Sequence, residues 1–117
     1  MNTLEQIQQQ RVEFVNQMLQ ITSACAGSIS EQYLSARKNG KPTSEKVGPY
    51  YVLTAKKHGR TVSKRLKGEH TLEQTQLAID NHNKLRCLMK EFEELTLKMG
   101  EITQQQSVSE EAQKKGL

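Results

Sequence analysis

The sequence is poor in the residues that build a large core. Its 117 residues include no Trp, two Phe and three Tyr, and the apolar share is 34%. Typical domains reach roughly 45–50% when glycine is also counted, so we expect a small core and much helical surface facing water or a partner chain. Residues 1–103 should form one helix-hairpin-helix domain, and residues 104–117, which lose the apolar period, should fray or be disordered.

Long apolar runs and a leader pattern are missing too. No stretch approaches the ~20 apolar residues that span a bilayer, so no membrane association is expected. The N-terminus does not show the order of charged, apolar and small residues that is typical of a signal peptide. Both absences favour a cytoplasmic protein.

Cysteine chemistry has little support in the sequence. Cys25 and Cys87 are the two cysteines, they lie in different predicted helices, and no ligand spacing links them to the three histidines. Two half-buried thiols are therefore favoured over a zinc site, and neither a metal nor a cofactor is expected.

The sequence also lacks a catalytic constellation. Nucleophilic catalysis needs a Ser or Cys beside an oriented base, and general acid-base catalysis needs paired titratable groups in a cleft. The acids Glu91, Glu93 and Glu94 cluster on a predicted helix, where a solvated face is typical, and no GxxxxGK phosphate loop occurs. We therefore expect no enzyme and no catalytic residues.

Acidic residues are scarce in the middle of the chain. Between Arg37 and Lys67 there are ten Lys or Arg and one acid, Glu45, whereas the remaining residues hold seven bases and twelve acids. The charge is thus segregated into +9 and −5, which give the formal net charge of +4. A local basic patch attracts a phosphate backbone, so nucleic acid is the predicted partner, with DNA favoured over RNA.

Two copies of Thr-Leu-Glu-Gln, at residues 3–6 and 71–74, have the form of a capping box and predict helix starts. The first helix should run to about residue 25, with an apolar stripe that Arg11 interrupts. In the second helix the apolar spacings alternate three and four. That stripe consists of Leu72, Ile79, Leu85, Leu88, Phe92, Leu95, Met99 and Ile102. Such helices pack antiparallel within one chain or pair in a homodimer, and the sequence leaves both open.

The segment between these helices predicts a short helix, a loop and a hairpin. Ser28 and Glu31 have capping-box spacing, which predicts a short helix ended by Asn39-Gly40. Residues 39–48 read as a polar loop, and residues 50–67 as two strands joined by a turn at His58-Gly59. The expected fold is mainly α with a small β element (α+β): an N-terminal helix, a short helix, a two-stranded antiparallel hairpin and a long C-terminal heptad-patterned helix.

The hairpin is the predicted binding surface. A two-residue turn places apolar side chains such as Tyr51, Leu53 and Leu66 on one face, and a three-residue loop with a bulge would mix the faces. A β-ribbon fits the ~12 Å major groove of B-DNA. The alternative is that the cations only solvate an edge-rich ribbon. The predicted nucleic-acid-binding residues are Lys41, Lys46, Tyr50, Lys56, Lys57, Arg60, Lys64, Arg65 and Lys67.

Four short motifs in order are similar to a family of small bacterial and archaeal proteins of unknown function. They are residues 27–33 (GSISEQY), 40–42 (GKP), 48–54 (GPYYVLT) and 59–66 (GRTVSKRL), and the resemblance spans roughly residues 4–97. It implies the order of elements and no established activity. Many members carry three loop cysteines and a His before Gly-Pro, which are Asn39, Ser44, Lys46 and Val47 here.

Residues 48–95 also resemble, more weakly, the arm-type DNA-binding domain of phage integrases, in which a small sheet enters the major groove. Such domains usually have a third strand, for which the sequence offers no clear candidate. The predicted function is a small DNA-binding protein with a basic β-hairpin, a regulator or accessory protein of a mobile element. The alternative is a structural or adaptor protein that acts through coiled-coil-like helices, with the hairpin as scaffold or RNA-facing surface.

Overall fold

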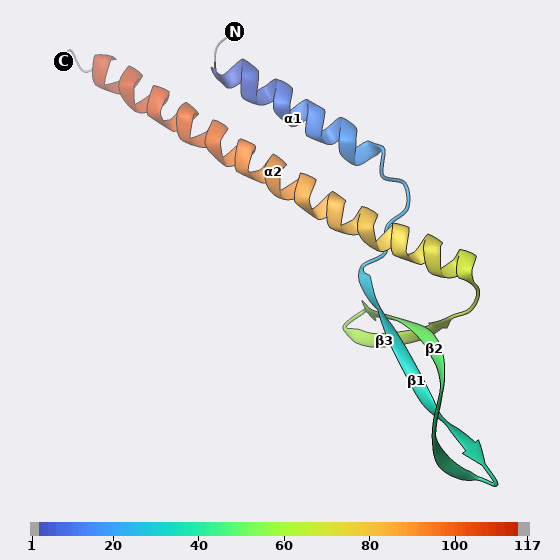
Figure 1. Ribbon diagram of the computed structural model, residues 1–117. Coiled ribbons are helices and arrows are strands. Elements are labelled where there is room, and N and C mark those ends of the chain that lie inside the picture. Colours follow the sequence, from blue (N-terminus) through green and yellow to red (C-terminus); the bar gives the residue numbers. More distant parts are fainter. Residues whose placement is uncertain (1–2, 115–117) are drawn as a thin grey trace. The chain divides into compact units, whose positions relative to one another are not determined.

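A computed structural model of the chain describes residues 3–114 and shows an α+β fold (Figure 1). The elements follow in the order α1 (Thr3–Leu19), β1 (Gly27–Lys38), β2 (Lys41–Lys57), β3 (Arg60–Leu66) and α2 (Glu69–Lys114). They form two compact units. Of the described residues, the helical unit joins residues 3–22 to residues 83–114, and the sheet unit comprises residues 23–82.

In the helical unit, α1 packs antiparallel to the later part of α2 (Figure 1). The predicted stripe of the second helix is confirmed, because all eight of its residues are buried or half-buried. In α1 the stripe residues Leu4, Ile7, Phe14 and Met18 are also buried or half-buried. Ile7 and Leu88 are the best buried, at 3% and 6% exposure. Helix α1 ends at Leu19, earlier than the predicted residue 25. Neither helix within residues 3–114 carries a stretch apolar enough to cross a bilayer.

Arg11 occupies the interrupted position of the α1 stripe and packs into the helical unit. Its guanidinium carbon lies 4.8 Å from the centre of the Phe92 ring, and its Nη1 donates to Met99 Sδ at 3.3 Å and to Gln8 Oε1 at 2.7 Å. Its Nε is buried and meets no acceptor among the described residues. The ring offsets part of the cost of removing this cation from water.

Helix α2 is longer at both ends than the sequence predicts. It begins at Glu69, directly after Gly68, so the predicted N-cap Thr71 lies within the first turn. It continues to Lys114 through most of the segment for which a frayed tail was expected, and residues 115–117 lie outside the described residues.

The prediction of a short helix after Ser28 is wrong, because residues 27–38 form strand β1. Asn39 and Gly40 have φ of 54° and 77°, the left-handed values of a two-residue type I′ turn. The prediction that this pair ends a helix is therefore wrong. This turn joins β1 to β2 as an antiparallel pair, so the sheet has three strands in the order β1-β2-β3 instead of two.

The second hairpin is confirmed with its predicted turn. His58 and Gly59 have φ of 53° and 78°, and Lys57 pairs directly with Arg60 across them. The two-residue loop is therefore correct, and the three-residue alternative is excluded. The register runs without a bulge to the pair Tyr51 and Leu66.

Strand β2 is the centre of the sheet, but β3 covers only part of it. Its first ten residues, 41–50, pair with β1 alone, and this two-stranded arm has register shifts after Gln32 and after Ser35. In the sheet unit Leu66 and Ile79 are the buried residues, each 8% exposed. The amide of Cys25 donates to the Ala78 carbonyl at 2.9 Å, which ties the entry of β1 to the start of α2.

Gly48 occupies a position in the sheet that is favourable only for glycine. Its φ is +146°, and an added Cβ would lie 3.0 Å from the Gln32 carbonyl oxygen and 3.1 Å from the Tyr33 ring. Both the backbone conformation and the close approach therefore disfavour any side chain here.

We expect Gly48→Ala to lower the free energy of unfolding by about 1–3 kcal/mol, the usual cost of a strained backbone. Gly100→Ala is the control: the site lies in α2 with open space around its Cβ, so it should gain up to about 1 kcal/mol. Urea unfolding followed by circular dichroism measures both. Equal stability of the two variants would contradict the assigned role of Gly48.

Candidate nucleic-acid interface

The predicted binding residues are accessible in the sheet unit. The eight cations among them are exposed, and Tyr50 is half-buried. Within the part of the chain that the structure describes, no carboxylate forms an ion pair with any of the eight. Among the described residues, these eight cations are thus exposed and without a carboxylate partner.

The register divides these residues between the two faces of the sheet. Lys56 and Arg65 share a face with Thr54 and Ser63, as the sequence predicts. Lys57, Arg60 and Lys64 lie on the opposite face, together with the apolar Leu53 and Leu66. Lys67 follows the last residue of β3. The cations thus surround the sheet instead of lining one face.

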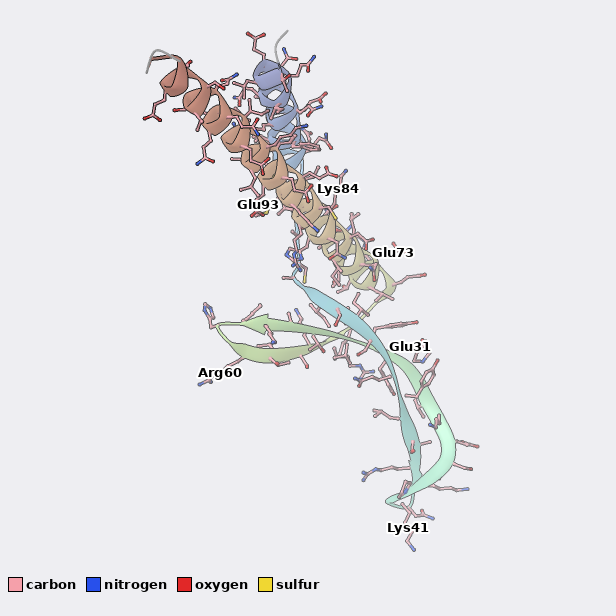
Figure 2. The ribbon with its side chains drawn as sticks, turned by 90° about the vertical axis from the view of Figure 1, so that its left-hand side faces the viewer. Glu31, Lys41, Arg60, Glu73, Lys84 and Glu93 are labelled. Carbon is pink, nitrogen blue, oxygen red and sulfur yellow. The ribbon has the colours of Figure 1, made fainter. Side chains whose placement is uncertain are left out.

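Both hairpin tips place like charges directly opposite each other. Lys38 pairs with Lys41 across the Asn39-Gly40 turn, and Lys57 pairs with Arg60 across the His58-Gly59 turn. Figure 2 shows the labelled Lys41 and Arg60 at the ends of two separate hairpins. We call these four residues the cationic tips. Like charges at directly opposed positions destabilise a strand pair.

Sequence reasoning missed Lys38, and Arg37 beside it, as members of this surface. Both were assigned to the end of a short helix, where they would not oppose the cations of the next segment. The signal that could have placed them is the Asn-Gly dipeptide, the strongest short-range indication of a two-residue hairpin turn.

Tyr50 and Arg65 form a stacked pair on the Thr54 face. The guanidinium carbon of Arg65 lies 3.8 Å from the centre of the Tyr50 ring. Stacking uses the flat face of the guanidinium and leaves its in-plane N–H groups free to donate. Arg65 is exposed, so its donors are held in a defined orientation toward solvent.

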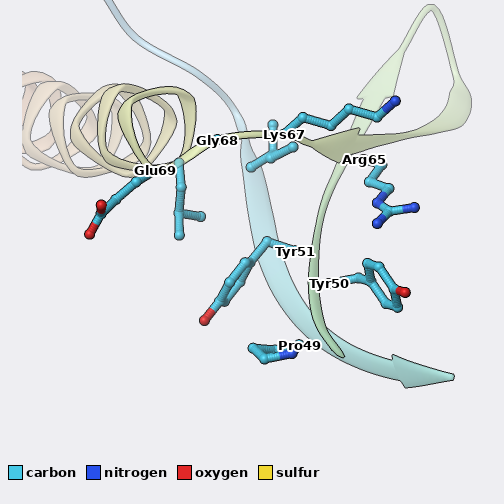
Figure 3. Close-up of a pocket in the computed structure, with 9 residues that line it drawn as sticks. Pro49, Tyr50, Tyr51, Arg65, Lys67, Gly68 and Glu69 are labelled. Carbon is cyan, nitrogen blue, oxygen red and sulfur yellow. The ribbon is translucent and has the colours of Figure 1, made fainter. Parts of the chain in front are cut away.

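A pocket of about 490 Å³ lies beside this pair (Figure 3). Strand β2 contributes Pro49, Tyr50 and Tyr51, the end of β3 contributes Arg65 and Leu66, and the chain into α2 contributes the rest of the wall. Aromatic and aliphatic surface therefore meets basic side chains at this end of the sheet.

Tyr33, on the two-stranded arm, has a raised pKa. Its hydroxyl donates to Glu31 Oε1 at 3.0 Å, and this hydrogen bond to the carboxylate raises the pKa of Tyr33 above its ordinary value, with burial and the charge of Glu31 adding to the rise. Tyr33 thus stays protonated at neutral pH, and the hydrogen bond is lost only as the pH rises through this raised pKa.

The described residues contain no group of three His, Cys, Asp or Glu that could hold a metal ion. Cys25 is half-buried as predicted, whereas Cys87 is exposed on α2. The expectations of no metal, no cofactor and no catalytic residue stay predictions.

No family model matches the chain, and no curated protein or solved structure gives a significant match. The resemblances drawn from the motifs therefore stay predictions. Strand β1 is a third strand, for which the sequence offered no clear candidate.

Relief of the repulsion at one tip should stabilise the sheet. Lys57→Glu places a carboxylate opposite Arg60, and we expect a gain of about 0.5–1 kcal/mol at low salt. Lys46→Glu is the matched control, because Lys46 opposes Ser35 and the change in net charge is the same. Thermal unfolding of both variants is measured at low and high ionic strength. Salt should reduce the gain in stability of Lys57→Glu, because it screens the attraction between the introduced carboxylate and Arg60. Equal effects of both variants would show that the opposed pair carries no repulsion.

Proposed function

We propose that this protein binds duplex DNA through the cationic tips and the polar face of its three-stranded sheet. The observation that carries the proposal is the pairing of like charges at both turns. Each pair lowers the stability of the free protein, and a phosphate between the two cations would replace the repulsion by two attractive contacts.

A purely solubilising role explains this arrangement less well. Single lysines along a strand are sufficient to discourage edge-to-edge aggregation. They do not need to be placed opposite one another at both tips, where they repel. Among the described residues, no carboxylate forms an ion pair with any of these four residues. This favours binding over a solubilising role, because nearby carboxylates would weaken attraction to a polyanion.

The polar face supplies short hydrogen-bonding groups between the cations. The register sets Ser28, Thr54 and Ser63 side by side across the three strands, with Arg65 and Lys56 on the same face. A β-ribbon or small sheet of this kind enters the major groove of B-DNA, where such side chains contact base edges while cations contact phosphates. The deep and narrow major groove of A-form RNA excludes it, which favours DNA. A regulator or accessory protein of a mobile element stays the predicted setting.

The helical unit is the proposed site of self-association. A second copy is the favoured occupant, because Met89 and Leu97 are 55% and 60% exposed on α2 and a dimer would present two sheets to a symmetric DNA site.

DNA binding is tested by fluorescence anisotropy with a labelled random-sequence duplex at several salt concentrations. We expect a steep loss of affinity as salt rises. In a plot of log affinity against log salt concentration, the steepness should fall by roughly 0.9 for each phosphate contact that a variant removes. The double variants Lys38→Ala/Lys41→Ala and Lys57→Ala/Arg60→Ala should each bind at least about tenfold more weakly at moderate salt.

The matched control is Lys84→Ala/Lys90→Ala, which removes two exposed cations from α2 and should leave affinity nearly unchanged. No binding by the wild type at low salt, or an equal loss in this control, would refute the proposal. Duplex RNA of the same sequence, tested in parallel, should bind more weakly than DNA.

Self-association is tested by size-exclusion chromatography with light scattering. The wild type should show twice the chain mass of 13.3 kDa, and Met89→Glu/Leu97→Glu should give the mass of one chain because charges would be buried in the interface. Lys90→Glu changes the net charge equally at an exposed polar position and should stay dimeric. A single-chain mass for the wild type at high concentration would contradict the dimer.

A further inference from the structure

The pocket at the end of the sheet is a second feature that DNA phosphates alone do not explain. Its volume of about 490 Å³ falls in the range of roughly 300–1,000 Å³ that is usual for ligand sites. It exists because β3 ends at Leu66, whose partner is Tyr51, so that Pro49 and Tyr50 have no paired residue in β3. The sheet edge is open where the chain turns into α2.

One side of the pocket is apolar. Tyr51 and Leu66 face it from the sheet, and Leu72 faces it from the first turn of α2. Tyr51 and Leu72 are half-buried and Leu66 is buried, so these walls are held by the packing of the sheet unit. Figure 3 shows the Tyr51 ring beside Pro49, across from Glu69.

The other walls carry charge of both signs. Arg65, stacked on Tyr50, lines the pocket from the face of the sheet opposite to Tyr51. Lys67 provides a second cation, and Glu69 provides a carboxylate from the start of α2. Among the described residues Glu69 forms no ion pair with either cation. The pocket therefore offers a π-surface, anion-binding groups and a hydrogen-bond acceptor as separate elements.

This combination limits the ligand. A simple anion would gain from Arg65 and Lys67 but would leave the apolar wall unused and meet the carboxylate of Glu69. An apolar molecule would leave three charged groups unpaired. A nucleotide satisfies all three features, because its base stacks on aromatic rings, its amino group donates to a carboxylate and its phosphates pair with cations.

We infer that the pocket receives the base of an unpaired nucleotide, stacked on Tyr51, while Arg65 and Lys67 contact the adjoining phosphates. The inference rests on the proposed DNA binding and narrows its ligand to duplexes that contain an unpaired base, such as a bulge or a single-stranded end. The cationic tips hold the duplex, and the pocket distinguishes this ligand from fully paired DNA.

The test compares two labelled duplexes of one sequence, fully paired or with a single unpaired 2-aminopurine. Wild-type protein should bind the second duplex about fivefold or more tightly, as expected for one base stacked on an aromatic ring. The fluorescence of 2-aminopurine should fall when the base stacks. Tyr51→Ala should abolish both the preference and the quenching without changing affinity for paired DNA, and Tyr51→Phe should retain both.

Leu72→Trp provides a second variant that fills the pocket without removing a sheet side chain, and it should also abolish the preference. Lys57→Ala/Arg60→Ala should weaken binding of both duplexes and keep their ratio. Equal wild-type affinity for the two duplexes would overturn the inference while leaving DNA binding intact. Absence of binding to either duplex would overturn both. If Tyr51→Ala and Leu72→Trp keep the preference for the duplex with the unpaired base, the preference comes from DNA flexibility and not from the pocket. That result would overturn the inference.

Discussion

Two tight turns determine the sheet and its surface. A type I′ turn requires positive φ at both central residues, and Asn39-Gly40 and His58-Gly59 meet this requirement at the two ends of β2. Each turn sets the pairing of the residues beside it, and this pairing decides which side chains face each other. The same two turns therefore create the three-stranded sheet and bring the cations at its tips into opposed pairs.

The placement of these cations departs from what stability alone would select. Opposed like charges lower the stability of a sheet. Among the described residues of the sheet unit, Leu66 and Ile79 are the buried ones, so apolar burial adds little to the stability of this unit. A local arrangement that lowers stability is expected where a ligand supplies the compensation. In the proposed function a bound DNA backbone would supply it at both tips, and Arg65, stacked on Tyr50, would add a hydrogen-bond donor.

Much of the fold could be predicted from the sequence, and the errors have a physical cause. The alternation of three and four identified the buried stripe of α2, and His58-Gly59 identified the second hairpin but left its register open between two alternatives. Strand β1 was missed because Ser28 and Glu31 match a capping box, a local pattern that does not test whether the following residues have a helical apolar period. The pocket could not be predicted, since its walls come from β2, the end of β3 and the start of α2, whose arrangement in space the sequence does not give.

The account depends on contact between DNA and the hairpin tips, and amide chemical shifts in a ¹⁵N-labelled sample report this contact residue by residue. On addition of a short duplex, the largest shifts should lie at residues 37–41 and 57–60, with smaller shifts along the polar face of β2 and β3. Shifts confined to α1 and α2, or none at the tips under conditions where DNA is bound, would contradict the account.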